Sequence, residues 1–186
     1  MGRWNIRWSI LLVLWCVTGV KLAAMKVESL DRGWFFNRGY ESQAADKVTV
    51  DLPHTWNAAD AMFGNVNYYR GMSTYSRFIV VPSSENFKRV FLRVKAAQTV
   101  ADVYLDNHFV AQHKGGYTSF TVELTHLIRR GEKQKLDIRV SNAQTMEIAP
   151  ICGDFNIWGG LNRGVELLYT DDACIDPTFY GSFGVF

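Results

Sequence analysis

Alternation of apolar and polar side chains is the main pattern in this chain. It is clearest in four segments, at residues 89–96, 101–105, 118–124 and 135–140. A period of two with one apolar face is typical of half-buried β-strands. Four further strands are predicted at 47–52, 74–81, 108–113 and 164–169. No segment keeps the 3.6-residue period of an amphipathic helix.

Turn-forming residues separate these segments. Asp106 and Asn107 lie between 101–105 and 108–113, and both residue types tolerate positive φ, so a tight hairpin is expected. Gly115-Gly116 and Gly131 mark further breaks. Eight or nine short antiparallel strands at this spacing predict an all-β fold, namely a jelly-roll β-sandwich.

The N-terminal segment has a different character. Arg3 and Arg7 precede an apolar stretch at 9–20, which is followed by the small residues Ala23 and Ala24. This order is that of a secretory signal peptide. The apolar run is shorter than the roughly 20 residues that span a bilayer. We therefore expect residues 1–24 to be a cleaved signal, with export to the periplasm or cell exterior and no stable membrane span afterwards.

Charge changes once that signal is set aside. The formal net charge is +2, from 20 basic and 18 acidic residues. Arg3, Arg7 and Lys21 lie in the predicted signal, which contains no acid, so 17 basic and 18 acidic residues remain. The basic residues are scattered, and this excludes the electrostatic pattern of a nucleic-acid-binding domain.

Two cysteines remain after the predicted cleavage. In an exported protein, Cys152 and Cys174 can form a disulfide. The equally supported alternative is that Cys152 and Cys174 are two buried free thiols.

One turn-rich loop carries the candidate chemistry. Residues 154–163 read Asp-Phe-Asn-Ile-Trp-Gly-Gly-Leu-Asn-Arg and lead into an apolar run. The carboxylate of Asp154 can accept bonds from two sugar hydroxyls, and Trp158 can stack on a sugar face. The alternatives are an aspartate that caps backbone N–H groups and a tryptophan that belongs to the core or to a domain interface.

Residues 33–186 resemble glycoside hydrolase family 2, and within it the β-galactosidase group. The resemblance rests on motifs in the expected order: WFFNRG at 34–39, VDLPHTWN at 50–57, NYYRG at 67–71 with YSRF at 75–78, ADVYLDN at 101–107, HKGGYTSF at 113–120, DFNIWGGLNR at 154–163 and CIDP at 174–177. It implies an N-terminal sugar-binding domain at 25–170. It also implies that 171–186 is a linker or the start of an immunoglobulin-like domain, with a TIM barrel beyond.

The resemblance also assigns roles. Asp154 corresponds to an aspartate that touches the sugar, and either Asn65 or Asn67 corresponds to an asparagine that holds a sugar hydroxyl. Both catalytic glutamates would lie on the barrel, so no catalytic residue is expected in this chain. No organic cofactor or metal is expected here either, because a sodium or magnesium ion would need the full-length enzyme.

The chain's own glutamates do not suggest a catalytic pair. Retaining glycosidases place two carboxyl groups about 5–5.5 Å apart. Glu123 and Glu166 fall at outward positions of strands, and Glu147 lies in a loop without an evident partner. The leading hypothesis is therefore a domain of an exported β-glycosidase, with a carbohydrate as its ligand and the later domains as its partners. A stand-alone carbohydrate-binding module and a scaffold domain are the alternatives.

Other conspicuous residues have structural readings. Arg70 and Arg163 are expected to hold loops by pairing with carboxylates. His54 lacks companions at metal-ligand spacing, and Trp56 is expected to fill the core.

Overall fold

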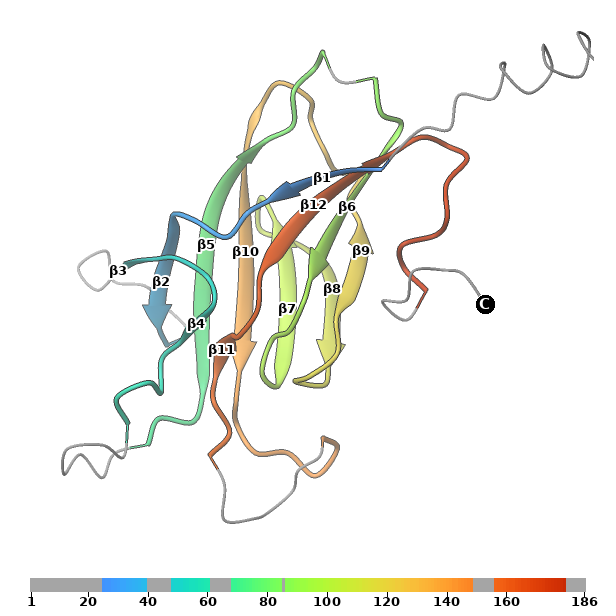
Figure 1. The fold of residues 1–186 in the computed structure, drawn as a ribbon. Helices are drawn as coiled ribbons and strands as arrows, with labels where there is room; N and C mark the ends of the chain where they lie inside the picture. The colour runs from blue at the N-terminus through green and yellow to red at the C-terminus, as the bar shows by residue number, and fades with distance from the viewer. Residues whose placement is uncertain (1–24, 40–47, 61–67, 85, 149–155, 180–186) are drawn as a thin grey trace, which may run out of the picture.

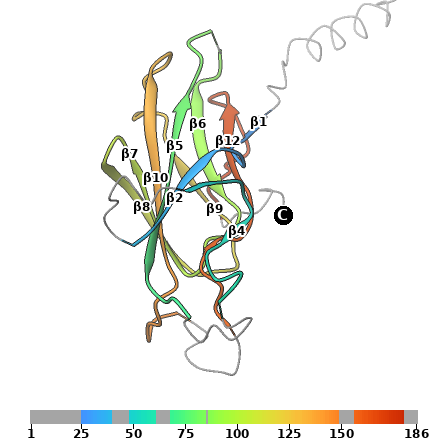
Figure 2. The same ribbon diagram turned by 90° about the vertical axis from the view of Figure 1, so that its left-hand side faces the viewer.

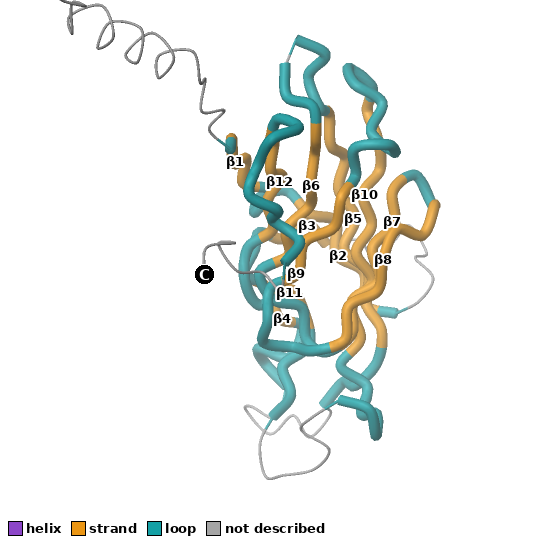
Figure 3. The backbone as a smooth tube through the Cα atoms, turned by 90° about the vertical axis from the view of Figure 1, so that its right-hand side faces the viewer, coloured by secondary structure: helices purple, strands orange, loops and turns teal. Residues whose placement is uncertain are grey.

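A computed structural model of the chain describes residues 25–39, 48–60, 68–84, 86–148 and 156–179 (Figure 1). Its strands form two facing antiparallel sheets, which are seen edge-on in Figures 2 and 3. The first sheet has the order β1 (Lys26–Ser29), β12 (Val165–Thr170), β6 (Arg89–Val94) and β9 (Phe120–Glu123). The predicted all-β jelly-roll sandwich is confirmed.

The second sheet is larger. Its order is β3 (Val48–Val50), β2 (Trp34–Arg38), β5 (Met72–Val80), β10 (Lys133–Ser141), β7 (Val100–Leu105) and β8 (His108–Lys114). A separate two-stranded pair joins β4 (His54–Thr55) to β11 (Gly160–Leu161). Asp106 and Asn107 form the β7–β8 turn with φ values of 48° and 66°, as the sequence predicted.

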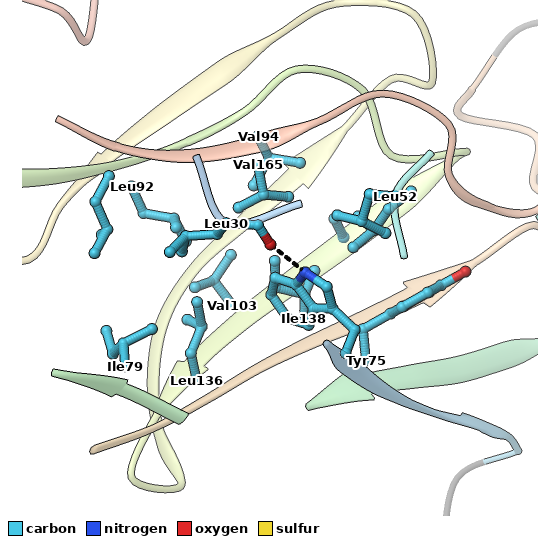
Figure 4. Close-up of a cluster of buried hydrophobic side chains, with 14 of the residues drawn as sticks. Leu30, Leu52, Tyr75, Ile79, Leu92, Val94, Val103, Leu136, Ile138 and Val165 are labelled. Carbon is cyan, nitrogen blue, oxygen red and sulfur yellow. Dashed lines mark hydrogen bonds between the residues drawn. The ribbon is translucent and has the colours of Figure 1, made fainter. Parts of the chain in front are cut away.

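The alternating pattern produces the core. Leu136, Ile138 and Val140 on β10 are fully buried in the core cluster. Figure 4 shows Leu136 and Ile138 facing apolar side chains of the other sheet, among them Leu92 and Val165. Trp34 is also fully buried, and its indole N–H donates to the carbonyl of Leu30 at 2.6 Å. This bond satisfies a polar group that burial would otherwise penalise.

The outer face of the four-stranded sheet is also covered. Phe91 and Leu168 are direct cross-strand partners on that face, and both are fully buried. Arg89 lies over the Phe91 ring at 4.7 Å and contacts Cys174 Sγ at 3.7 Å. The irregular segment 171–179 runs beside β6 and β9 (Figure 1), so it contributes to this cover. Its expected continuation into another domain stays a prediction.

Within the described ranges, no helix is long and apolar enough to cross a membrane. The predicted signal peptide lies outside the described residues.

Candidate functional site

Two buried asparagines hold together the end of the sandwich where β4 and β11 pair. Asn57 is fully buried and uses its whole amide. Its Oδ1 accepts from Gly159 N at 2.8 Å and from Asn142 Nδ2 at 3.1 Å. Its Nδ2 donates to Asp60 Oδ2 at 2.7 Å and to the Tyr69 carbonyl at 2.9 Å. All four of its hydrogen-bonding positions are therefore occupied.

Asn142 completes the network, and it is likewise fully buried. Its Oδ1 accepts from Gly71 N at 2.9 Å, and its Nδ2 lies 3.1 Å from the Ile157 carbonyl. The Tyr68 hydroxyl donates to the same carbonyl at 2.5 Å. We call Asn57, Asn142 and their partners the asparagine node. It fixes the backbone at 157–159 to three other parts of the chain.

The glycine pair in the DFNIWGGLNR motif is required by close approach. A Cβ on Gly159 would lie 2.0 Å from Cζ2 of Trp56, and one on Gly160 would lie 2.3 Å from the His54 carbonyl. Gly160 also has φ of +133°, which side chains rarely adopt. These glycines let β11 pair with β4, so this part of the motif, read from sequence as a loop, is a strand. Trp56 is 5% exposed, which confirms its predicted core role.

A cavity of about 520 Å³ opens beside this strand pair. Trp158 lines it with 40% of its surface exposed, and Tyr117 with 62%. His54 also lines it, and its Nδ1 lies 2.7 Å from the Tyr75 hydroxyl. Burial lowers the pKa of the His54 imidazole, so this residue is neutral at pH 7. Trp158 is therefore not a core residue, while its two other predicted roles, contact with a sugar and contact with another domain, stay predictions.

Most of the other predicted site residues cannot be placed. Asp154, Asn65, Asn67 and Cys152 lie outside the described residues, so their sugar-binding roles and the disulfide remain predictions. Asp60 and Tyr68 border the undescribed segment 61–67, and Ile157 lies shortly after the undescribed segment 149–155. All three belong to the asparagine node.

The carboxylate pairing expected of Arg70 and Arg163 is not found within the part of the chain that the structure describes. Within the described residues, neither has a carboxylate partner. Arg70 lies over the Tyr68 ring at 5.6 Å, and Arg163 lines the cavity.

The three glutamates singled out from the sequence form ion pairs with basic residues. Glu123 holds Arg89 in a bidentate pair, with N–O distances of 3.0 and 2.8 Å. The Arg89 guanidinium, helped by the Thr125 hydroxyl, lowers the pKa of Glu123 to about 2. Glu166 pairs with Lys95 and, at 4.0 Å, with Arg93.

Glu147 pairs with Lys114, which corrects the expectation that it lacks a partner. In the described part of the chain, no cluster of three or more His, Cys, Asp or Glu side chains could hold a metal ion.

The node residues were not singled out from the sequence. Asn57 and Asn142 lie in connections between strands, where asparagine usually signals a turn. Their bonds reach as far as 102 residues along the chain, from Asn57 to Gly159. The position of Asn57 at the end of the VDLPHTWN motif was the one available signal.

Comparison with known proteins agrees with this architecture. Residues 27–171 match the family model described as "Glycosyl hydrolases family 2, sugar binding domain". The chain is 40% identical over 157 residues to a β-glucuronidase of Bacteroides fragilis, covering 84% of this chain and 22% of that protein. It is 30% identical over 134 residues to a β-galactosidase of Thermoanaerobacter pseudethanolicus, covering 70% and 18%.

A solved structure gives the same picture. The β-glucuronidase 2 of Bacteroides uniformis, in a covalent complex with cyclophellitol-6-carboxylate aziridine, superposes with a TM-score of 0.77 at 31% identity. The match covers 86% of this chain and 20% of that protein. The chain therefore spans about a fifth of the length of these relatives.

Proposed function

We propose that this chain is the N-terminal domain of an exported β-glycosidase, because it belongs to the family of glycosyl hydrolase family 2 sugar-binding domains. The observation that carries this proposal is the family match over residues 27–171, with the fold that goes with it. The domain would shape one side of the sugar site, while the two catalytic carboxyl groups would lie on a later barrel.

The substrate class follows from the relatives. Those matched include β-glucuronidases and β-galactosidases, and the 40% identical relative is a β-glucuronidase. We therefore infer hydrolysis of a terminal β-glycoside, with a β-glucuronide as the first substrate to test and a β-galactoside as the second. The expected outcome at the anomeric carbon is retention, as in a double-displacement mechanism.

In this proposal, the domain contributes positioning. Asp154, with Asn65 or Asn67, would bind sugar hydroxyls by charge-assisted and neutral hydrogen bonds. The asparagine node supports this role because it anchors described residues next to both segments. A full-length enzyme that lost the node would hold these side chains less well and turn over more slowly.

The test is an activity assay on the product of the complete reading frame. We expect release of nitrophenol from 4-nitrophenyl β-D-glucuronide or β-D-galactoside, with retention of configuration followed by NMR. Asp154→Ala should lower kcat/KM at least about tenfold, while the exposed neighbour Asn156→Ala should leave it unchanged. A folded full-length protein that cleaves no β-glycoside would refute the proposal.

A further inference from the structure

We propose that the cavity beside Trp158 is a binding site for a sugar unit that carries a carboxylate or sulfate group. This site lies on the sandwich itself, at the β4–β11 pair. All the residues that line it belong to the described part of this chain, so it can be tested on this chain alone.

The shape of the cavity suits a small saccharide. Its volume of about 520 Å³ lies within the usual range for small-molecule sites. Trp158 and Tyr117 both line it and both remain substantially exposed. Exposed aromatic rings that face one hollow offer flat apolar surfaces, against which the C–H face of a sugar ring can pack.

The walls of the cavity are already in place. Gly159 lies against Trp56, and a Cβ on Gly116 would lie 2.9 Å from the Gln98 side chain. The asparagine node holds the backbone next to Trp158. A ligand would therefore enter a preformed cavity and would not need to order it, which favours binding.

Two amide side chains supply polar groups at this site. Gln98 and Asn162 both line the cavity, and Asn162 Nδ2 donates to Gln98 Oε1 at 3.1 Å. The same nitrogen donates to the Trp158 carbonyl at 3.1 Å. Asn162 Oδ1 is buried and has no hydrogen-bond partner among the described residues.

The charge of the cavity selects an anion. Arg163 is exposed, and it has neither an ion pair nor a hydrogen bond within the described part of the chain. No carboxylate is among the described residues that line the cavity, and His54 is neutral because burial lowers its pKa. An unneutralised guanidinium favours a carboxylate or sulfate over a neutral hydroxymethyl group.

The experiment is a calorimetric titration of the folded 186-residue chain with three sugars. Methyl β-D-glucuronide and glucose 6-sulfate carry the charge, and methyl β-D-glucoside is the neutral control. We expect saturable binding of at least one anionic sugar, at least about tenfold tighter than that of the glucoside. Binding of both sugars would indicate selection by charge, whereas binding of one would identify which anion the site accepts.

Variants separate the contributions of the aromatic ring and the charge. Arg163→Gln should remove the preference for the anionic sugar, and Trp158→Ala should weaken every sugar at least about tenfold. Arg32→Gln and Phe109→Ala are the matched controls, since both residues are exposed and neither lines the cavity, and they should change nothing.

Three results would overturn the proposal: no saturable binding by the folded wild type, neither anionic sugar bound more tightly than the glucoside, or an anion preference that persists in Arg163→Gln. A cavity that instead receives a side chain of a later domain would give the first of these results. Hydrolysis by the full-length protein would be unaffected by that outcome, so failure here and failure of the proposed function are distinguishable.

Discussion

Replacing Asn57 with alanine tests whether the asparagine node holds this end of the sandwich. The substitution removes four hydrogen bonds, to Gly159, Asn142, Asp60 and Tyr69. Three of these partners keep another bond. Asp60 still accepts from Tyr69 N at 3.1 Å, and Asn142 still donates to the Tyr69 carbonyl at 3.2 Å. The N–H of buried Gly159 is left without a partner among the described residues.

The size of the effect follows from these losses. An orphaned buried N–H costs about 1–3 kcal/mol, and a lost bond to a charged group such as Asp60 costs about 1.5–3 kcal/mol. Asn57→Ala should therefore reduce the free energy of unfolding by about 3–5 kcal/mol. For a chain of this size, 1 kcal/mol corresponds to about 2–4 °C in Tm. The melting temperature should therefore fall by about 6–20 °C.

Urea unfolding followed by circular dichroism measures this change. Asn156→Ala is the control, because Asn156 is exposed in the connection that precedes Gly159, and its replacement should change stability by less than about 0.5 kcal/mol. A double-mutant cycle with Asn142→Ala should show a coupling energy of at least about 0.5 kcal/mol. A loss below about 1 kcal/mol in Asn57→Ala, or strict additivity in the cycle, would refute the reasoning.

Four further substitutions test other parts of the fold by urea unfolding. Burial lowers the pKa of His54 below its ordinary 6.5, so the unfolded chain binds the proton more readily than the folded chain. The free energy of unfolding should therefore fall as pH drops below about 6.5, and His54→Gln should reduce that fall. Glu123→Gln should cost about 1 kcal/mol at neutral pH by removing the pair with Arg89. Since the pKa of Glu123 is lowered from 4.5 to about 2, this difference is complete above pH 4.5 and disappears as pH falls toward 2. Asn107→Gly should add about 0.5 kcal/mol, because the residue has φ of 66° in a two-residue turn. Gly159→Ala should cost about 3 kcal/mol or more, because the new methyl group meets an indole ring at 2.0 Å. Unchanged unfolding midpoints, or a pH dependence of opposite sign, would contradict these expectations.

Strong alternation made most of the sandwich predictable. The segments at 89–96, 101–105 and 135–140 correspond to β6, β7 and β10, which supply much of the core. Strand β1 was missed because its four residues, Lys-Val-Glu-Ser, carry little pattern and form a strand only by pairing with β12. Strands β4 and β11 have two residues each, too few for a periodic signal.

The site was less predictable because its determinants are distant in sequence. The exposed ring of Trp158 fits its predicted availability for a ligand, yet nothing local indicated that Tyr117 and Gln98 would line the same cavity. Glu147 seemed to lack a partner because Lys114 lies on β8, 33 residues away along the chain. A buried asparagine that bridges loops has the same local signature as one in an exposed turn.

The most direct test of the central claim is to read the intact transcript beyond the codon for Phe186. A domain of a family 2 β-glycosidase predicts that the frame continues through an immunoglobulin-like stretch into a barrel with two catalytic glutamates. A stop codon directly after Phe186 would contradict that claim, and the sugar titrations of this chain would then decide its function.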